Sequence, residues 1–249
     1  MFVFVVPLIG KESCSDWSVV SRLCRQSIRS MLAGLSEGRV ILACNEPPES
    51  LSSDPRLIVH TMPYVSRPNA FFDKTVDKYL KLKAGLIVAR QFTPTWLMRA
   101  DADDLISNKL VPFVERQDPR TAWYSAVGWA HIDQSRWVTK FRDFHLLCGT
   151  SCVTHVTKDD LPDTMMRPDS EFYLLTQGHN IIVEYLRNSA ITTRPVPFPT
   201  TIYVTDSGEN ISGPWLTKLK SRRMRVKTAL NTRYLSRSIG SEFGLSTTI

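Results

Sequence analysis

The residues with the clearest capacity for chemistry are three carboxylates in the run Asp101-Ala-Asp103-Asp104, directly after an apolar stretch that ends at Ala100. Alternate residues that leave a strand point to the same side, so Asp101 and Asp103 can converge on one cation. Carboxylate oxygens suit a hard divalent ion such as Mg²⁺ or Mn²⁺, which also binds substrate phosphates. A structural interpretation competes: the aspartates cap a helix that starts near Leu105 and favour its dipole. The residues alone leave both interpretations open.

Short apolar runs and amphipathic stretches predict the elements that position this acidic cluster. Buried strands are predicted at 2–6, 39–45, 57–60 and 95–100, with helices at 16–35 and 73–91. Ser15 or Asp16 is the expected N-cap of the first helix. This order is typical of an α/β fold with a doubly wound, mostly parallel sheet flanked by helices.

Ligands of such a sheet bind beyond the carboxyl ends of its strands, and three polar clusters fall there. They are Pro7–Gly10, Asn45–Glu46 and Asp101–Asp104. The helix between the third and fourth strands is expected to turn its basic residues, Lys78, Lys81, Lys83 and Arg90, toward solvent. We therefore expect a ligand site at this edge of the sheet.

Downstream of the cluster, the pattern mixes strands and short helices. Helices are predicted at 108–116 and 169–177, strand-like segments at 122–132, 137–141, 144–156 and 181–186, and a Pro- and Thr-rich loop at 191–213.

Composition limits the class of protein. The chain has 249 residues, of which 43% are hydrophobic, which suits one sizeable core. Its five cysteines lack zinc-site spacing, so free, mostly buried thiols in a reducing compartment are expected. No apolar run approaches the length of a membrane span, and the start lacks the pattern of a signal peptide. We therefore expect a cytoplasmic protein.

Positive charge is concentrated near the end of the chain. The formal net charge is +7, and residues 214–239 contain eight basic residues and no acidic one. Apolar residues in this segment are spaced for a helix, which predicts a basic helical extension over 214–249 after a main domain over 1–213. Three roles stay open for it: docking on an anionic membrane surface, contact with nucleic acid, or a solvated helix packed on the main domain.

The predicted order of strands and helices, together with the Asp101-Ala-Asp103-Asp104 run, resembles the GT-A glycosyltransferases. Within them it is most similar to the bacterial family-two-like enzymes. The likeness covers about residues 1–190 and rests on a first strand ending at Pro7, a second ending at Glu46, and a lysine-bearing helix before the Asp-x-Asp-Asp run. It implies a GT-A (Rossmann-like) fold in which Asp103 is the main metal ligand and Asp101 faces the metal or the donor ribose. It further implies that Pro7, Leu8 and Glu46 line a nucleobase pocket, with Lys83 or Arg90 near the base or phosphates.

The same resemblance places an acidic pair, Asp169-Ser-Glu171, where the family has its catalytic base. One of these carboxylates would take the proton of the acceptor hydroxyl. As helix-capping residues they would need no chemical role. Gly149 and Thr150 would form the floor of the acceptor site, and His179 is the histidine expected nearest the diphosphate or metal.

The expected function is a metal-dependent glycosyltransferase that uses Mn²⁺ or Mg²⁺. We expect transfer with inversion at the sugar carbon, and a retaining mechanism stays open. It would move a sugar from a nucleoside-diphosphate-sugar to a glycan or lipid-linked acceptor in surface polysaccharide synthesis, at the inner face of the membrane if the basic segment binds lipid. The alternatives are a nucleic-acid-binding protein that uses the basic segment and a non-catalytic GT-A-like binding protein.

Overall fold

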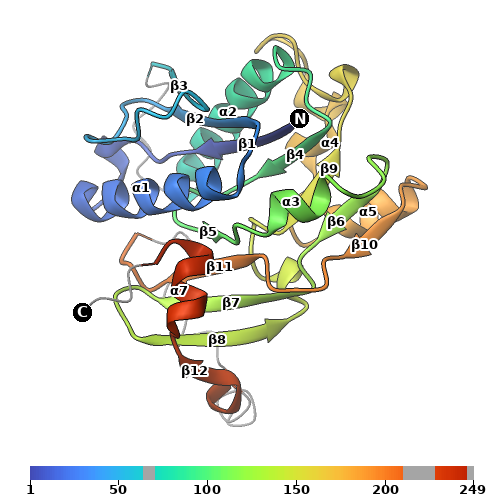
Figure 1. Cartoon of the computed structure of the whole chain (residues 1–249). Coiled ribbons are helices and arrows are strands. Elements are labelled where there is room, and N and C mark those ends of the chain that lie inside the picture. The colour runs from blue at the N-terminus through green and yellow to red at the C-terminus, as the bar shows by residue number, and fades with distance from the viewer. Residues whose placement is uncertain (64–70, 210–227, 246–249) are drawn as a thin grey trace.

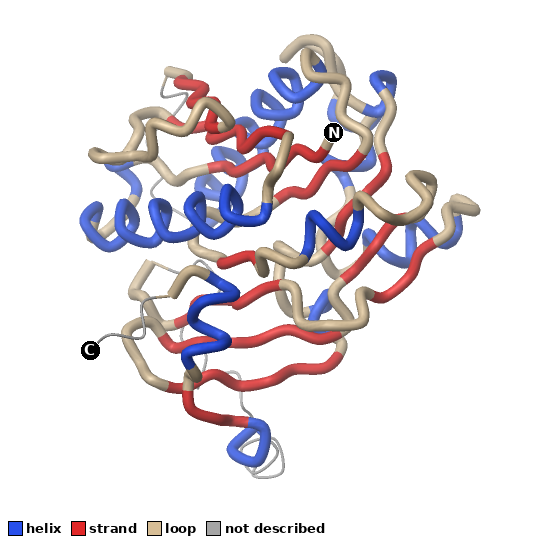
Figure 2. Tube along the Cα trace, viewed as in Figure 1, coloured by secondary structure: helices blue, strands red, loops and turns tan. Residues whose placement is uncertain are grey.

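The computed structural model describes residues 1–63, 71–209 and 228–245, and it places them in two β-sheets with helices between and around them (Figure 1, Figure 2). The larger sheet has seven strands in the order β10-β6-β9-β4-β1-β2-β3, and the smaller has five in the order β12-β8-β7-β11-β5. The mixed α/β class expected from the sequence is confirmed.

The elements of the larger sheet and its helices have the following bounds. The strands are β1 (Phe2–Pro7), β2 (Gly38–Cys44), β3 (Leu57–Thr61), β4 (Trp96–Arg99), β6 (Ala122–Tyr124), β9 (Cys152–His155) and β10 (Thr193–Pro195), and the helices are α1 (Trp17–Gly34), α2 (Phe71–Arg90), α3 (Leu110–Val114), α4 (Tyr173–Thr176) and α5 (Ile182–Asn188). The smaller sheet contains β5 (Leu105–Ile106), β7 (Val127–Ile132), β8 (Trp137–Arg142), β11 (Thr201–Thr205) and β12 (Thr232–Tyr234), and α7 (Arg237–Phe243) follows β12.

The order in which the chain adds strands to the larger sheet reverses at β1. β2 and β4 flank β1 and both run parallel to it, while β9 is antiparallel to its neighbours β4 and β6. The chain thus fills one side of β1 with β2 and β3 and then returns through α2 to fill the other side with β4. Such a reversal is the topological switch point of a doubly wound sheet, where ligands bind outside the carboxyl ends of the strands.

Both faces of β1 are buried because each is covered by a different helix. Phe2, Phe4 and Val6 pack in the core cluster that includes the apolar face of α1. Val3 and Val5 pack in the cluster that includes α2. This explains why β1 is an uninterrupted apolar run rather than an alternating one.

Helix α1 begins and ends close to the residues predicted. The Asp16 side chain accepts hydrogen bonds from the backbone N–H groups of Ser18 (2.8 Å) and Val19 (3.3 Å), which identifies Asp16 as the N-cap. Leu23 projects from α1 into a third core cluster formed by the smaller sheet and α7. Helix α1 therefore lies between the two sheets and joins them into one body (Figure 1).

Four predictions of local structure are wrong. No helix begins near Leu105, because residues 105–106 form β5 and pair with β11. Residues 182–188 form helix α5 rather than a strand. The loop predicted at 191–213 contains β10 and β11. Strand β12 interrupts the helix predicted through residue 239.

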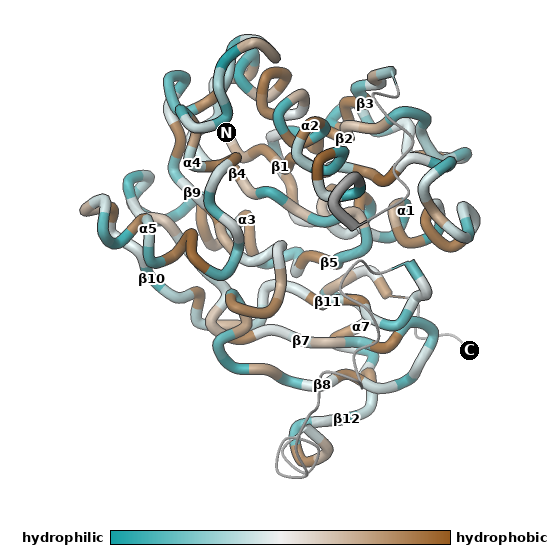
Figure 3. The backbone as a smooth tube through the Cα atoms, turned by 180° about the vertical axis from the view of Figure 1, so that it is seen from behind, coloured by the Kyte–Doolittle hydropathy of each residue, from teal (hydrophilic) through white to brown (hydrophobic). Residues whose placement is uncertain are grey.

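The remaining predictions about the C-terminal segment lie largely outside the described residues. Residues 210–227, which contain most of the basic run, are not described. Among the residues that are, β12 pairs with β8, and α7 packs on the smaller sheet through Ile239 and Phe243. Many of the peripheral loops consist of hydrophilic residues, which are drawn in teal in Figure 3.

All five cysteines are free thiols, and four of them are buried, as predicted. No described helix is both long and apolar enough to cross a bilayer.

Candidate functional site

The acidic cluster lies at the carboxyl end of β4, directly beside β1 at the switch point. The backbone continues the parallel pairing just past the strand, because the Ala100 N–H donates to the Val5 carbonyl at 3.0 Å. A strand, β5, follows the cluster, so Asp101, Asp103 and Asp104 cap no helix. The interpretation of these three carboxylates as helix-capping residues is therefore wrong.

Asp101 is held from three directions. Its backbone N–H donates to the Thr150 hydroxyl at 2.8 Å, and its carbonyl accepts from the Ser27 hydroxyl at 3.4 Å. Its carboxylate Oδ1 lies 2.5 Å from Nζ of Lys78, in the first half of α2. The Asp101 side chain is still 28% exposed, so it remains open to a ligand.

The pKa values of the cluster reflect burial and mutual repulsion. Burial opposes ionisation of Asp101, but the Lys78 ammonium holds its pKa below the ordinary value. Burial and the negative charge of Asp101 raise the pKa of Asp103 to about 7. Burial, reinforced by its two acidic neighbours, raises the pKa of the fully buried Asp104 well above the ordinary value. The three carboxyl groups therefore carry fewer than three negative charges at neutral pH.

The segment Cys148–Thr150 forms the wall against which the acidic cluster rests. The Cys148 thiol donates to Oδ2 of Asp104 at 3.2 Å, while Oδ1 of Asp104 is buried without a hydrogen-bond partner. Thr150 is fully buried, and its carbonyl accepts from the Thr201 hydroxyl of the smaller sheet at 2.9 Å. Thr150 therefore positions Asp101 and links the two sheets, and its place in the floor of an acceptor site stays a prediction.

Gly149 lies directly against the side chain of Asp101, the candidate metal ligand. A Cβ at this position would lie 2.8 Å from Oδ2 of Asp101, which is closer than van der Waals contact allows. A larger residue at position 149 would therefore force the Asp101 carboxylate away from its place beside Lys78.

We expect Gly149→Ala to reduce activity about 100-fold while changing the melting temperature little, because the added methyl group displaces the Asp101 carboxylate. Turnover and thermal unfolding should be measured together. Gly178→Ala is the matched control, since its Cβ would also meet a side-chain oxygen, at 2.9 Å, but that oxygen belongs to the exposed Asn180. Equal activity in wild type and Gly149→Ala would contradict this role of Gly149.

One further cation, Arg99, and one histidine, His179, lie near Asp101. Arg99 donates to the Leu174 carbonyl at 2.5 Å and to the Gln177 carbonyl at 3.0 Å, which fixes its guanidinium behind the cluster. Burial lowers the pKa of His179, and the charge of Asp101 partly opposes that effect. His179 is thus close to the cluster, as the sequence analysis expected.

The contact of Lys78 with Asp101 was not predicted from the sequence. A usable signal existed, because Lys78 falls in the first half of a helix that starts at the ligand-binding edge of the sheet, whereas Arg90 ends the helix at the opposite edge. Arg90 donates to the carbonyls of Lys158 and of Leu161 (2.8 Å), which ties down a loop there. The placement of Arg90 near a base or phosphates is therefore wrong.

The expectation that the lysines of α2 face solvent is also wrong for two of them. Lys81 is fully buried and lies 2.6 Å from Oδ2 of Asp77. Lys83 is 5% exposed, and its Nζ donates to the Arg167 carbonyl at 2.5 Å and to Oδ1 of Asp169 at 2.7 Å. Lys83 therefore binds a loop rather than standing free for a phosphate.

The two candidates for the base are both engaged in ion pairs. Asp169 is paired with Lys83, and Glu171 is paired with Arg167. Neither carboxylate is the N-cap of its short 3₁₀ turn, which begins after Pro168. Both side chains are well exposed, at 55% and 39%, so their role as a base stays a prediction that requires these ion pairs to open.

The residues expected to line a nucleobase pocket lie at the same edge as Asp101. Pro7 ends β1, and Leu8 is buried, with its N–H donating to the Ala43 carbonyl at 2.9 Å. Glu46 follows the end of β2 and is half-buried. The structure thus places this group and the acidic cluster on one edge, beyond β1, β2 and β4.

The sequence matches no protein-family model, and no curated protein matches it significantly. The functional assignment therefore depends on the fold and on the geometry of the site.

The chemistry of the acidic cluster fits a divalent cation. Asp101 and Asp103 supply hard oxygen donors of the kind that Mg²⁺ and Mn²⁺ prefer, and a cation would relieve the repulsion that raises the pKa of Asp103. Within the described ranges, no group of three or more His, Cys, Asp and Glu side chains is close enough to hold a metal by itself. Oxygen atoms of a bound substrate or of water would have to complete the coordination, as is usual for Mg²⁺ at phosphate sites.

Proposed function

We propose that this chain is a metal-dependent glycosyltransferase of the GT-A type, which moves a sugar from a nucleoside-diphosphate-sugar to an acceptor hydroxyl. One observation carries the proposal: Asp101 and Asp103 lie at the switch point of a doubly wound sheet, beyond the carboxyl end of β4, where they cap no helix. This is where such sheets bind nucleotides. Helix capping does not explain these carboxylates, and Asp101 pairs with Lys78 at the edge where a ligand of such a sheet would bind.

The residues around Asp101 suit a donor with a charged diphosphate. A cation held by Asp101 and Asp103 would act as a Lewis acid on the leaving diphosphate. Lys78 lies 2.5 Å from Asp101 and is 40% exposed, so its ammonium can turn from the carboxylate to a phosphate oxygen. Gly149 leaves room for the Asp101 carboxylate, because a Cβ at this position would lie 2.8 Å from its Oδ2 atom.

The acceptor side of the reaction needs a base and a bound hydroxyl. Asp169 and Glu171 remain the candidates for the base, and Lys83 and Arg167 would have to release them. Gly149 is the residue of the predicted acceptor floor that faces the cluster. In this proposal the acceptor is a glycan or a lipid-linked sugar. The proposal also includes docking of residues 214–239 on an anionic membrane.

A donor screen tests the proposal. Purified protein with Mn²⁺ or Mg²⁺ should release nucleoside diphosphate from one nucleotide-sugar, slowly to water and faster when a mixture of glycan acceptors is added. The same screen with EDTA should show no release. Absence of release with every common nucleotide-sugar, combined with metal-dependent binding of a nucleoside diphosphate, would favour the non-catalytic GT-A-like binding protein instead.

A further inference from the structure

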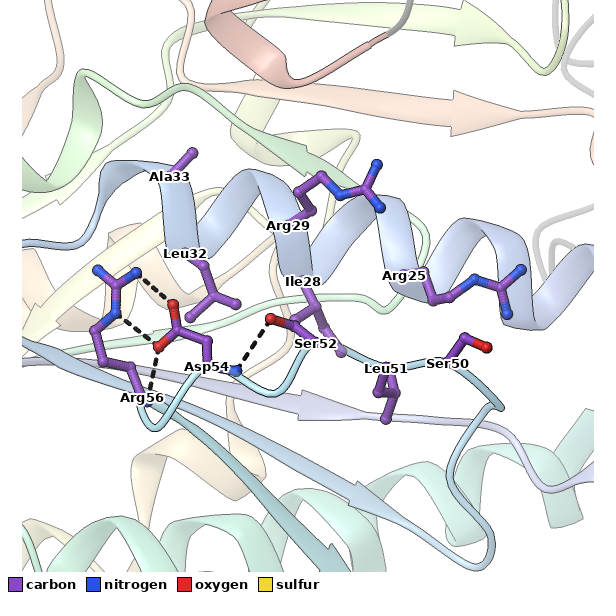
Figure 4. Close-up of a pocket in the computed structure, with 10 residues that line it drawn as sticks. All are labelled: Arg25, Ile28, Arg29, Leu32, Ala33, Ser50, Leu51, Ser52, Asp54 and Arg56. Carbon is purple, nitrogen blue, oxygen red and sulfur yellow. Dashed lines mark hydrogen bonds and ion pairs between the residues drawn. The ribbon is translucent and has the colours of Figure 1, made fainter.

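A groove on the flank of α1 lies apart from the proposed active site (Figure 4). Its volume is about 360 Å³, and it is bounded by α1 on one side and by residues 50–56 of the β2–β3 connection on the other. Ten residues line it: Arg25, Ile28, Arg29, Leu32, Ala33, Ser50, Leu51, Ser52, Asp54 and Arg56. This volume lies within the range of small-molecule sites in proteins.

The floor of the groove is apolar and rigid. Ile28 and Leu32 belong to the core cluster beneath α1, and Leu51 packs against that cluster from the connecting segment. The far end is closed by Arg56, whose guanidinium forms a fork with the Asp54 carboxylate, with Nε–Oδ1 of 2.9 Å and NH2–Oδ2 of 2.6 Å. Arg56 also donates to the Leu35 carbonyl, which ties this end to the end of α1. The groove is therefore a built surface and not a gap between mobile side chains.

Two arginines on the rim, Arg25 and Arg29, have no acidic partner among the residues that the structure describes. Arg25 donates to the backbone carbonyl of Glu49 at 3.1 Å, and Arg29 is exposed on the next turn of α1. In the ranges that the structure describes, neither guanidinium forms an ion pair or a hydrogen bond with a carboxylate. Figure 4 shows Arg25 extending from α1 beside Ser50 and Arg29 extending from the upper side of the helix, both away from the Arg56–Asp54 fork.

The connecting segment adds hydroxyl groups and a strained residue. Ser50 has φ 56°, in the left-handed region that non-glycine residues rarely adopt, and it lies opposite Arg25. Backbone conformations of this rare kind are frequent in segments that bind ligands. The Ser52 hydroxyl accepts from the Asp54 N–H at 3.2 Å and keeps its own proton to donate.

We propose that this groove binds a small soluble molecule that carries a phosphate group, with Arg25 and Arg29 as the main contacts. The lining contains three arginines and one aspartate, so its charge is +2. A phosphate monoester carries about −1.5 to −2 at neutral pH, which matches that charge. Guanidinium groups bind phosphate in paired, directional hydrogen bonds, and the apolar floor would receive the carbon body of the ligand.

The inference does not depend on the proposed function, because the groove shares no residue with the acidic cluster. The test is calorimetric titration of the full chain with inorganic phosphate and with glycerol 3-phosphate, in EDTA so that no metal-dependent donor binding contributes. Wild type should bind glycerol 3-phosphate more tightly than phosphate. Arg25→Gln and Arg29→Gln should each weaken binding about 10-fold, because each removes a charge-assisted contact.

The matched control is Arg194→Gln, which removes an exposed arginine on β10, far from α1 in the sheet order, and should leave binding unchanged. Circular dichroism checks that every variant is folded, which we expect because Arg25 and Arg29 make no core contact. Equal binding by wild type and both groove variants, or no binding of either probe by wild type, would overturn the proposal.

A membrane headgroup offers the same phosphate chemistry, and a second arm of the experiment distinguishes it. The chain is sedimented with vesicles of phosphatidylcholine alone and of phosphatidylcholine with phosphatidylglycerol. Vesicle binding that Arg29→Gln abolishes, without any binding of glycerol 3-phosphate, would overturn the proposal of a soluble ligand.

Discussion

Asp103→Asn should lower the rate of sugar transfer about 1,000-fold or more, because it removes a metal ligand at the point where charge develops on the leaving diphosphate. The same substitution should leave the melting temperature unchanged or raise it. Asp101 and Asp103 repel one another in the folded protein, and burial opposes the charge of both. Removing one charge relieves that cost. A loss of activity without a loss of stability is the expected signature of a functional carboxylate.

The control for this prediction is Asp159→Asn, which removes an exposed carboxylate from a 3₁₀ turn in the segment after β9. Its activity and melting temperature should both match wild type. Nucleotide release under saturating donor and thermal unfolding in the same buffer give the two readouts. If Asp103→Asn keeps more than a tenth of the wild-type rate with Mn²⁺ present, the assignment of Asp103 fails.

The largest effect on stability is expected from Asp77→Ala. Lys81 is fully buried, and Asp77 is its ion-pair partner at 2.6 Å, one turn earlier in α2. Truncating Asp77 leaves the ammonium buried without a counter-charge, and breaking such a pair costs about 3–5 kcal/mol of unfolding free energy. Chemical denaturation of the variant should show a lower midpoint with an unchanged slope. The double variant Asp77→Leu with Lys81→Met should recover most of the loss, because apolar groups can replace a buried pair.

The pH dependence of Asp77→Ala gives an independent check. Burial already lowers the pKa of Lys81 in the wild-type protein, and loss of Asp77 removes the two largest opposing contributions. Between the lowered folded pKa and the unfolded value near 10.5, the unfolded chain binds more protons than the folded one. The stability of the variant should therefore rise with pH in that window, relative to wild type. A difference between the two proteins that stays constant with pH would contradict the burial of a charged Lys81.

The parts of the fold that the sequence predicted are those with strong local patterns. β1 is a continuous apolar run because α1 and α2 cover its two faces. Helix α1 has both an amphipathic face and a side-chain N-cap at Asp16. The order of these elements was enough to place the carboxyl end of β4, and with it Asp101 and Asp103, at the ligand-binding edge.

The parts that the sequence did not predict depend on contacts between distant residues. β5 has two residues, and it becomes a strand only because β11, almost a hundred residues later, pairs with it. The N-cap and first residues of α5 form the apolar run Ile181–Val183, which alone favours a strand. Packing against Ala122 and Cys152 selects the helix, because residues one turn apart then face the same cluster.

Contacts between residues far apart in the sequence also explain why some predictions within the candidate site were wrong. Lysines on an amphipathic helix normally face water, but Lys83 has its partner at Asp169, eighty-six residues away in sequence. The periodicity of a helix cannot predict an ion pair with a residue so far away in the sequence. The contact of Gly149 with Asp101 is of the same kind, since a glycine shows its purpose only when its neighbour in space is known.

The measurement that tests the central claim most directly is calorimetric titration of wild type and Asp103→Asn with nucleoside diphosphates, each with Mn²⁺ and with EDTA. We predict that one nucleoside diphosphate binds wild type with Mn²⁺ at least about 10-fold more tightly than in EDTA, since the cation joins the diphosphate to Asp101 and Asp103. Asp103→Asn should lose this dependence on the metal. Binding of equal strength with and without Mn²⁺, or equal binding by both proteins, would contradict a metal-assisted nucleotide site at the acidic cluster.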